Sequence, residues 1–178
     1  MKLVGLLLVV LGLVGCAGSQ PVFDQKTPGT PVALTPPSTA PAPRKVFNGK
    51  DWQLSVEDDG WRRGTSDSAV LALLNFTART VVVLERKPGM ASLEDYSLAI
   101  EAELNPALTW SKEEALVAGY PGYKYTLHSR RSQIWGWMVV ANGKGYLLTC
   151  GTALSLAETN LEMCEDIAKH LVIVKAAP

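Results

Sequence analysis

An apolar run at the N-terminus sets the conditions under which the rest of this chain folds. Lys2 supplies one positive charge, and residues 3–14 then continue for twelve positions without a polar side chain. At a rise of about 1.5 Å per residue the run spans about 18 Å, well short of the hydrocarbon core of about 30 Å. A charged start and a short apolar run followed by small residues are typical of a secretory signal. We therefore expect the rest of the chain to fold in an oxidising compartment.

The apolar run ends in Leu13-Val14-Gly15-Cys16, and Ala17 follows. This ending resembles the lipobox of bacterial lipoproteins, which implies cleavage before Cys16 and attachment of fatty acyl chains, palmitate among them, to that cysteine. Two or more chains hold a protein durably on a membrane, so the membrane is the first expected partner. By the same resemblance, Ala17 implies the outer membrane, facing the periplasm, in a diderm cell. The alternative is an ordinary signal with a free or buried cysteine.

A proline-rich segment separates the signal from the remainder of the chain. Seven of the 28 residues from 17 to 44 are proline, interspersed with Thr, Ser, Ala and Gly. Proline lacks a backbone N–H and fixes φ, so this segment favours an extended coil over a hydrogen-bonded sheet. The sequence therefore predicts a signal peptide at 1–15, acylated Cys16 with a tether at 16–44, and one globular domain at 45–176.

The charge balance argues against one class of partner. Lys and Arg total 17, as do Asp and Glu, and loss of the signal removes only Lys2, leaving 16 against 17. A chain this close to neutral lacks the basic surface on which nucleic-acid binding depends. We expect no nucleic-acid partner.

Short alternating or apolar stretches between turn residues predict β-strands in the globular domain. They are residues 52–56, 69–76, 80–85, 114–117, 123–128, 134–141, 145–150 and 172–174, with a loop or strand start at 61–63. Residues 119–122 predict a turn, and Asn142-Gly143 predicts a tight hairpin.

Two helices are predicted from periodic apolar residues and capping residues. Ser92 precedes an amphipathic stretch over 93–104, which Pro106 brings to an end. A capping box at 155–158 predicts the start of the second helix. Its expected inner face comprises Leu161, Cys164, Ile167, Ala168 and Leu171. The order of elements predicts an α+β fold, an antiparallel sheet of about six or seven strands covered by helices.

These elements, in this order, resemble the PsbP-like superfamily, which includes Mog-type and DcrB-like proteins. The resemblance rests on the strand at 52–56 with Gly60-Trp61 after it, the valine strand before the helix at 93–104, the turn at 117–122, the hairpin at 142–148 and the closing helix. It covers most of residues 46–174 and implies an α/β/α sandwich. It also implies an accessory or assembly role with no common catalytic centre.

The residues that carry chemistry are few. Cys150 and Cys164 are an even pair in an oxidising compartment, and we interpret them as a structural disulfide worth about 3 kcal/mol rather than as two buried free thiols. His128 and His170 have no partner at metal-ligand spacing. No nucleophile elbow, zinc-protease motif or phosphate-binding glycine loop occurs. We therefore expect no metal, no cofactor and no enzymatic activity.

Two tryptophans mark a candidate binding surface. Trp135 and Trp137 share one face of the strand at 134–141, and they either belong to the core or line a groove for a partner. Tyrosines and arginines, which are frequent in protein interfaces, lie nearby in the sequence. The candidate surface comprises Tyr120, Tyr123, Tyr125, Arg130, Arg131, Trp135 and Trp137.

Together these predictions describe a lipid-anchored envelope accessory protein that binds or stabilises a partner protein or assembly. A carrier of a small apolar ligand or lipid is the first alternative, and a closed apolar pocket beneath the two tryptophans would favour it. An uncharacterised hydrolase is the second alternative, and it would require a serine, a histidine and an acid within hydrogen-bonding distance.

Overall fold

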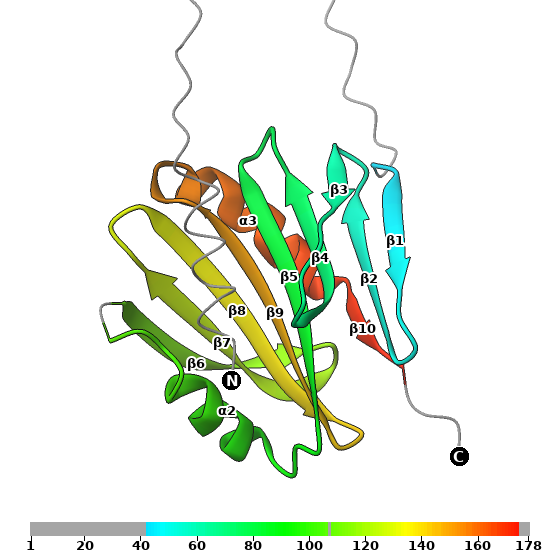
Figure 1. Ribbon diagram of the computed structural model, residues 1–178. Coiled ribbons are helices and arrows are strands. Elements are labelled where there is room, and N and C mark those ends of the chain that lie inside the picture. Colours follow the sequence, from blue (N-terminus) through cyan, green and yellow to red (C-terminus); the bar gives the residue numbers. More distant parts are fainter. Residues whose placement is uncertain (1–41, 107, 175–178) are drawn as a thin grey trace, which may run out of the picture.

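The computed structural model describes residues 42–106 and 108–174, and Figure 1 shows their arrangement. In chain order the elements are β1 Arg44–Asn48, β2 Trp52–Glu57, β3 Trp61–Arg63, β4 Ala69–Asn75, β5 Thr80–Pro88, α2 Leu93–Glu101, β6 Thr109–Val117, β7 Tyr120–His128, β8 Ser132–Ala141, β9 Lys144–Ala153, the 3₁₀ turn η1 Leu154–Leu156, α3 Ala157–Lys169 and β10 Leu171–Ile173. The predicted signal peptide, Cys16 and most of the predicted tether lie outside the described residues. Within the described ranges, no helix is long and apolar enough to cross a membrane.

The strands pair in two antiparallel sheets. The large sheet has seven strands in the order β3-β4-β5-β9-β8-β7-β6, and the small sheet has the order β1-β2-β10. Because β10 pairs with β2, the last described strand is held beside one of the first. The predicted α+β class and the predicted strand number of the main sheet are confirmed.

Both faces of the large sheet are covered, which explains the apolar composition of its central strands. α3 and the small sheet pack on one face, where Trp135 and Trp137 belong to the larger buried cluster. α2 packs over β8 on the other face, where Tyr96 and Met138 belong to a second buried cluster. β8 is buried along almost its whole length because it is a central strand with cover on both faces.

Two tight turns with left-handed residues join neighbouring strands of the large sheet. Asn142 and Gly143, with φ of 53° and 68°, close the β8–β9 hairpin as predicted. The β6–β7 hairpin turns at Ala118 and Gly119, with φ of 52° and 80°, and β7 begins directly afterwards. The turn predicted at 119–122 therefore lies one residue earlier, and Tyr120, Pro121 and Gly122 belong to β7. Alanine seldom adopts positive φ, so it gave no turn signal in the sequence.

Pro121 fits within β7 because its missing N–H is not needed there. Pro121 lies opposite Leu116, at a position of the β6–β7 ladder where the two residues exchange no hydrogen bond, and β8 pairs with β7 only from Gly122 onward. β6 begins at Thr109 rather than at the predicted residue 114. Its polar first half carries no apolar alternation, and the ladder with β7 defines it instead.

The helix ends agree with prediction at α2 and differ at α3. The Ser92 side chain caps α2 as predicted, and the helix ends at Glu101, short of residue 104. The predicted capping box at 155–158 is wrong, because η1 runs directly into α3 and leaves no side-chain cap. Leu171 belongs to β10 rather than to the inner face of the helix.

Cys150 of β9 and Cys164 of α3 form a disulfide, with their Cα atoms 5.8 Å apart. Both cysteines are fully buried in the larger cluster. The bond therefore fixes α3 to a central strand of the large sheet.

Candidate functional site

Strand alternation distributes the predicted surface residues over two faces of the large sheet. Trp135 and Trp137 are buried on the face covered by α3, and Tyr120 packs against the same cluster. Tyr123 and Tyr125 belong to the cluster beneath α2 on the opposite face. These five residues therefore do not form one continuous surface.

The two arginines of the predicted surface lie at a third location. Arg130 and Arg131 are exposed in the loop between β7 and β8, at the far end of β7 from Tyr120. The Leu154 N–H donates to the Arg131 carbonyl at 2.9 Å, so this loop is held beside η1. The structure does not bring these arginines to the tryptophans.

Tyr125 belongs to a hydrogen-bonded network that holds α2 on the sheet. Its hydroxyl lies 2.7 Å from Ser97 Oγ and 3.1 Å from Glu101 Oε1, and Lys112 Nζ reaches the same two groups at 2.9 and 2.8 Å. Burial raises the pKa of Tyr125, and the hydrogen bond from Lys112 lowers the pKa of Glu101. Because these groups satisfy one another, the network has a structural role.

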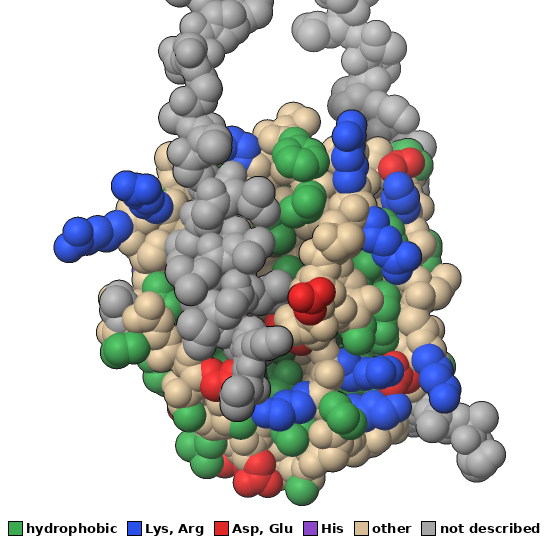
Figure 2. Space-filling model, in the orientation of Figure 1, with side chains coloured by type: hydrophobic (Ala, Val, Ile, Leu, Met, Phe, Trp, Pro, Cys, Tyr) green, Lys and Arg blue, Asp and Glu red, His purple; other side chains and the backbone are tan. Residues whose placement is uncertain are grey.

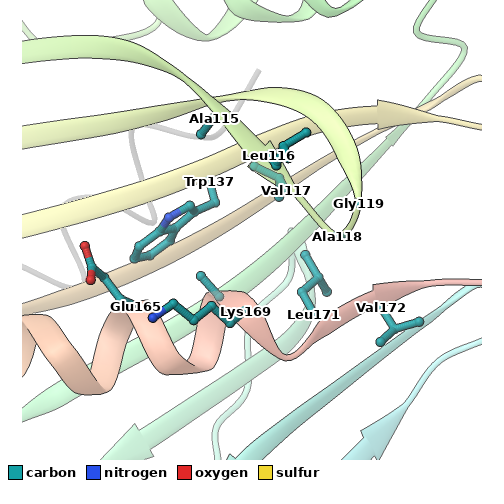
Figure 3. A pocket seen from close by; sticks show the side chains of 11 residues that line it. Ala115, Leu116, Val117, Ala118, Gly119, Trp137, Glu165, Lys169, Leu171 and Val172 are labelled. Atoms are coloured by element: carbon teal, nitrogen blue, oxygen red, sulfur yellow. The ribbon is translucent and has the colours of Figure 1, made fainter.

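An open groove lies beside Trp137, and we call it the Trp137 groove (Figure 3). The end of β6 and its turn form one wall, the end of α3 and the start of β10 form the other, and Trp137 lies between them. The groove has a volume of about 560 Å³. Its principal residues are Leu116, Ala118, Trp137, Glu165, Lys169 and Val172.

The walls of the groove differ in the apolar surface that they offer. Val172 is 48% exposed on one wall, whereas Trp137 at the base is only 6% exposed. Leu116 of the other wall is 81% exposed, but strand alternation places its side chain with those of Lys112 and Glu114 on the α2 face of β6. A partner in the groove would therefore contact Val172 and the edge of the indole. Trp135 is packed in the core and does not line the groove.

Charged side chains form one rim of the Trp137 groove. Lys124 of β7 bridges Glu113 at 3.6 Å and Glu165 at 3.0 Å, and so ties the hairpin to α3. Lys169 is exposed one turn after Glu165, at the mouth of the groove. Apolar walls with a charged rim are the usual composition of a protein-binding surface.

A second charged cluster joins the two sheets away from the groove. Asp51 is 7% exposed; Arg86 Nη1 donates to one carboxylate oxygen at 3.0 Å, and Lys144 Nζ donates to the other. Burial alone would raise the pKa of Asp51, but the hydrogen bonds from Lys144 and Arg86 outweigh it and lower the pKa. Figure 2 shows Lys and Arg side chains gathered at the lower right of the molecule, where Figure 1 shows the β1–β2 turn and the β8–β9 hairpin. The cluster holds the β1–β2 turn against the large sheet.

The remaining titratable groups do not converge on the groove. Glu85 is buried on β5, and burial together with the charge of Glu103 raises its pKa to about 7. His170 Nδ1 lies 2.8 Å from the Asp166 carbonyl, and His128 is exposed at the end of β7. Among residues 42–106 and 108–174, no group of three or more His, Cys, Asp or Glu side chains is placed to hold a metal ion.

Sequence reasoning missed that Leu116 and Val172, two residues at the groove, are exposed. Both fall in stretches predicted as strands, where an apolar residue is normally read as core. They are exposed because each lies on a face of an edge strand that no other element covers at that position. Sheet order depends on long-range pairing, so the sequence held no local signal for it.

No protein-family model and no curated protein matches the sequence. Among solved structures, the chain is similar to cyanobacterial PsbP (CyanoP) from Synechocystis, with a TM-score of 0.55 and 10% identity over 78% of this chain and 97% of that one. It is also similar to a Bacteroides thetaiotaomicron protein, with a TM-score of 0.53 and 9% identity over 75% of this chain and 49% of that one. For LpqN of Mycobacterium tuberculosis, a protein involved in cell envelope biogenesis, the TM-score is 0.49 and the identity 12%, over 78% and 88%. At these identities the likeness concerns the fold alone, and the chain has the PsbP-like α+β fold.

Proposed function

We propose that this protein is a lipid-anchored accessory protein of the cell envelope, without catalytic activity, that binds a partner protein through the Trp137 groove. The observation that carries the proposal is the groove itself, an open depression with exposed Val172 on one wall, the edge of Trp137 at its base and charged groups on its rim. The N-terminal sequence supports the anchor, because the apolar run ends in Leu13-Val14-Gly15-Cys16. In a diderm cell, the anchor would place the domain at the outer membrane on the periplasmic side.

The shape of the groove favours a protein over a small apolar ligand. Sites for small ligands bury most of the ligand surface in a concave, mostly apolar cavity. The Trp137 groove is open, and its tryptophan exposes little surface to an acyl chain. An extended or helical segment of a partner could instead cover both walls while its polar groups stay near Lys169 and Glu165.

Site-specific crosslinking in the native envelope tests the groove. A photo-reactive amino acid in place of Lys169 should capture one protein reproducibly, and Val172→Glu should reduce that capture at least about tenfold, because it places a charge on an apolar wall. Val46→Glu is the matched control, since Val46 is 49% exposed on another strand of the small sheet, outside the groove. Equal loss from both variants, or capture of lipid alone, would overturn the proposal.

A separate experiment tests the anchor. Mass spectrometry of the mature N-terminal peptide should find Cys16 as the first residue, carrying acyl chains, and Cys16→Ala should leave the precursor uncleaved at this site. An unmodified mature N-terminus at another residue would refute the lipid anchor. The crosslinking experiment would still test partner binding at the groove.

A further inference from the structure

β6 leaves one of its two edges unpaired in the part of the chain that the structure describes. It is the last strand of the large sheet, with β7 as its neighbour (Figure 1). The two-residue turn at Ala118-Gly119 makes Val117 and Tyr120 a hydrogen-bonded pair, and such pairs recur at every second residue of an antiparallel ladder. The odd-numbered residues of β6 therefore bond to β7, and the even-numbered residues direct their N–H and C=O groups outward.

The side chains at the even-numbered positions form an exposed row. Trp110, Lys112, Glu114 and Leu116 share one face of the strand, the face toward α2. Trp110 is 40% exposed and Leu116 is 81% exposed, so an apolar side chain lies at each end of the row. Two opposite charges lie between them.

This row is complementary to itself when the strand direction is reversed. If a second β6 pairs antiparallel about Glu113, Trp110 lies opposite the second copy's Leu116 and Lys112 lies opposite its Glu114. All the residues in these pairs are even-numbered, so they also carry the outward N–H and C=O groups. The register therefore forms backbone hydrogen bonds between the copies and pairs complementary side chains at the same positions. We propose that a second copy of this chain pairs with the β6 edge in this register and extends the large sheet across a two-fold axis.

The charges around the axis are compatible with this register. Lys112 Nζ already binds Ser97 Oγ and Glu101 Oε1, and an ammonium group has a third donor for Glu114 of the second copy. The two copies of Glu113 face each other at the axis, and the repulsion between their negative charges disfavours dimerisation. Lys124 lies 3.6 Å from Glu113 within each copy and offsets part of that repulsion.

The competing interpretation is that the charged centre of β6 protects a free edge from association. Lys and Glu on edge strands commonly serve that purpose. It does not account for Trp110 and Leu116 at the two ends of the row, since exposed apolar side chains on a free edge favour association. Only one register places Trp110 opposite Leu116 and Lys112 opposite Glu114 at the same time. Crosslinks at single positions can therefore test it.

Disulfide trapping tests the register in the full mature chain. Glu113 would be its own partner in a non-hydrogen-bonded pair, with Cα atoms about 4.5 Å apart, so Glu113→Cys should form an intermolecular disulfide under mild oxidation. Ser111→Cys is the matched control, exposed on the same face of the same strand. Its symmetry mate would lie about 13 Å away along the strand, beyond disulfide reach. No linkage at 113, or equal linkage at 111, would overturn the proposal.

Analytical sedimentation of the full mature chain in detergent tests whether the protein dimerises through the β6 edge. Glu114→Lys places two lysines opposite each other and should weaken dimerisation at least tenfold. Glu114→Pro should have a similar effect, because it removes an outward N–H that takes no part in the β6–β7 ladder. Circular dichroism and thermal denaturation should show both variants folded. A monomer at all accessible concentrations, or a dimer that both variants leave unchanged, would refute the pairing.

Discussion

Reduction of the Cys150–Cys164 disulfide should lower the free energy of unfolding by an amount that follows from the length of the loop it closes. The two cysteines are 14 residues apart in the sequence, and releasing a loop of that length adds denatured-state entropy worth about 3 kcal/mol at 25 °C. Both cysteines are fully buried in the larger cluster, so two thiols in place of the bond leave the packing nearly unchanged. For a domain of about 130 residues, such a loss lowers Tm by roughly 10–15 °C.

Urea and thermal denaturation before and after reduction measure this loss. The variant carrying both Cys150→Ala and Cys164→Ala should lose somewhat more stability than the reduced protein, because it also removes two buried sulfur atoms from the core. A loss below about 1 kcal/mol on reduction, with an unchanged m value, would refute the loop-entropy reasoning. A reduced protein that unfolds in two steps would instead show that α3 separates from the sheet before the rest unfolds.

Three further predictions concern single residues. Asp51→Ala should lower the free energy of unfolding by about 1–3 kcal/mol at neutral pH, since Arg86 and Lys144 lose a buried acceptor. Because the folded state lowers the pKa of Asp51, the stabilisation by this residue is present above about pH 4 and is lost on further acidification. Urea titrations at a series of pH values measure this dependence. Burial raises the pKa of Glu85 from 4.5 to about 7, so wild-type stability should fall as pH rises between these values, and Glu85→Gln should abolish that fall in the same titrations. Ala118→Gly should stabilise the protein by up to about 1 kcal/mol in calorimetry, because it relieves a residue with φ of 52°.

Local patterns in the sequence predicted most of the fold. The buried, valine-rich β5 and the long apolar β8 are central strands whose composition reflects cover on both faces, and each was predicted as a strand. The cap at Ser92 and the hairpin at Asn142-Gly143 are short-range features with a direct physical cause, and both are present. The errors came where tertiary contacts override local preference, as at the left-handed Ala118.

The candidate site was less predictable because it depends on which strands end up at sheet edges. Trp135 and Trp137 were correctly placed on one face of β8, yet the sequence could not show that only Trp137 would lie beside a groove. Trp135 and Trp137 pair with Thr126 and Lys124 of β7, so Tyr123 and Tyr125, which alternate with these two residues, lie on the opposite face. Register between β7 and β8 is fixed by the packing on both faces of the sheet.

The proposed tether and the proposed dimer together restrict how the protein can lie on a membrane. The Pro43 carbonyl accepts the Asp58 N–H, so the tether joins the domain at the end of the large sheet that carries Trp61 and Asn75, whereas the Ala118-Gly119 turn lies at the other end. Antiparallel pairing through β6 would reverse one copy, so the two tethers would leave from opposite ends of the shared sheet. Both anchors can reach one bilayer only if the sheet lies along the membrane and each tether is long enough to reach it. A segment of 28 residues would span about 30 Å as a flexible coil and about 90 Å fully extended, compared with about 30 Å for a nine-residue strand. A tether of this length would make double anchoring compatible with the proposed dimer.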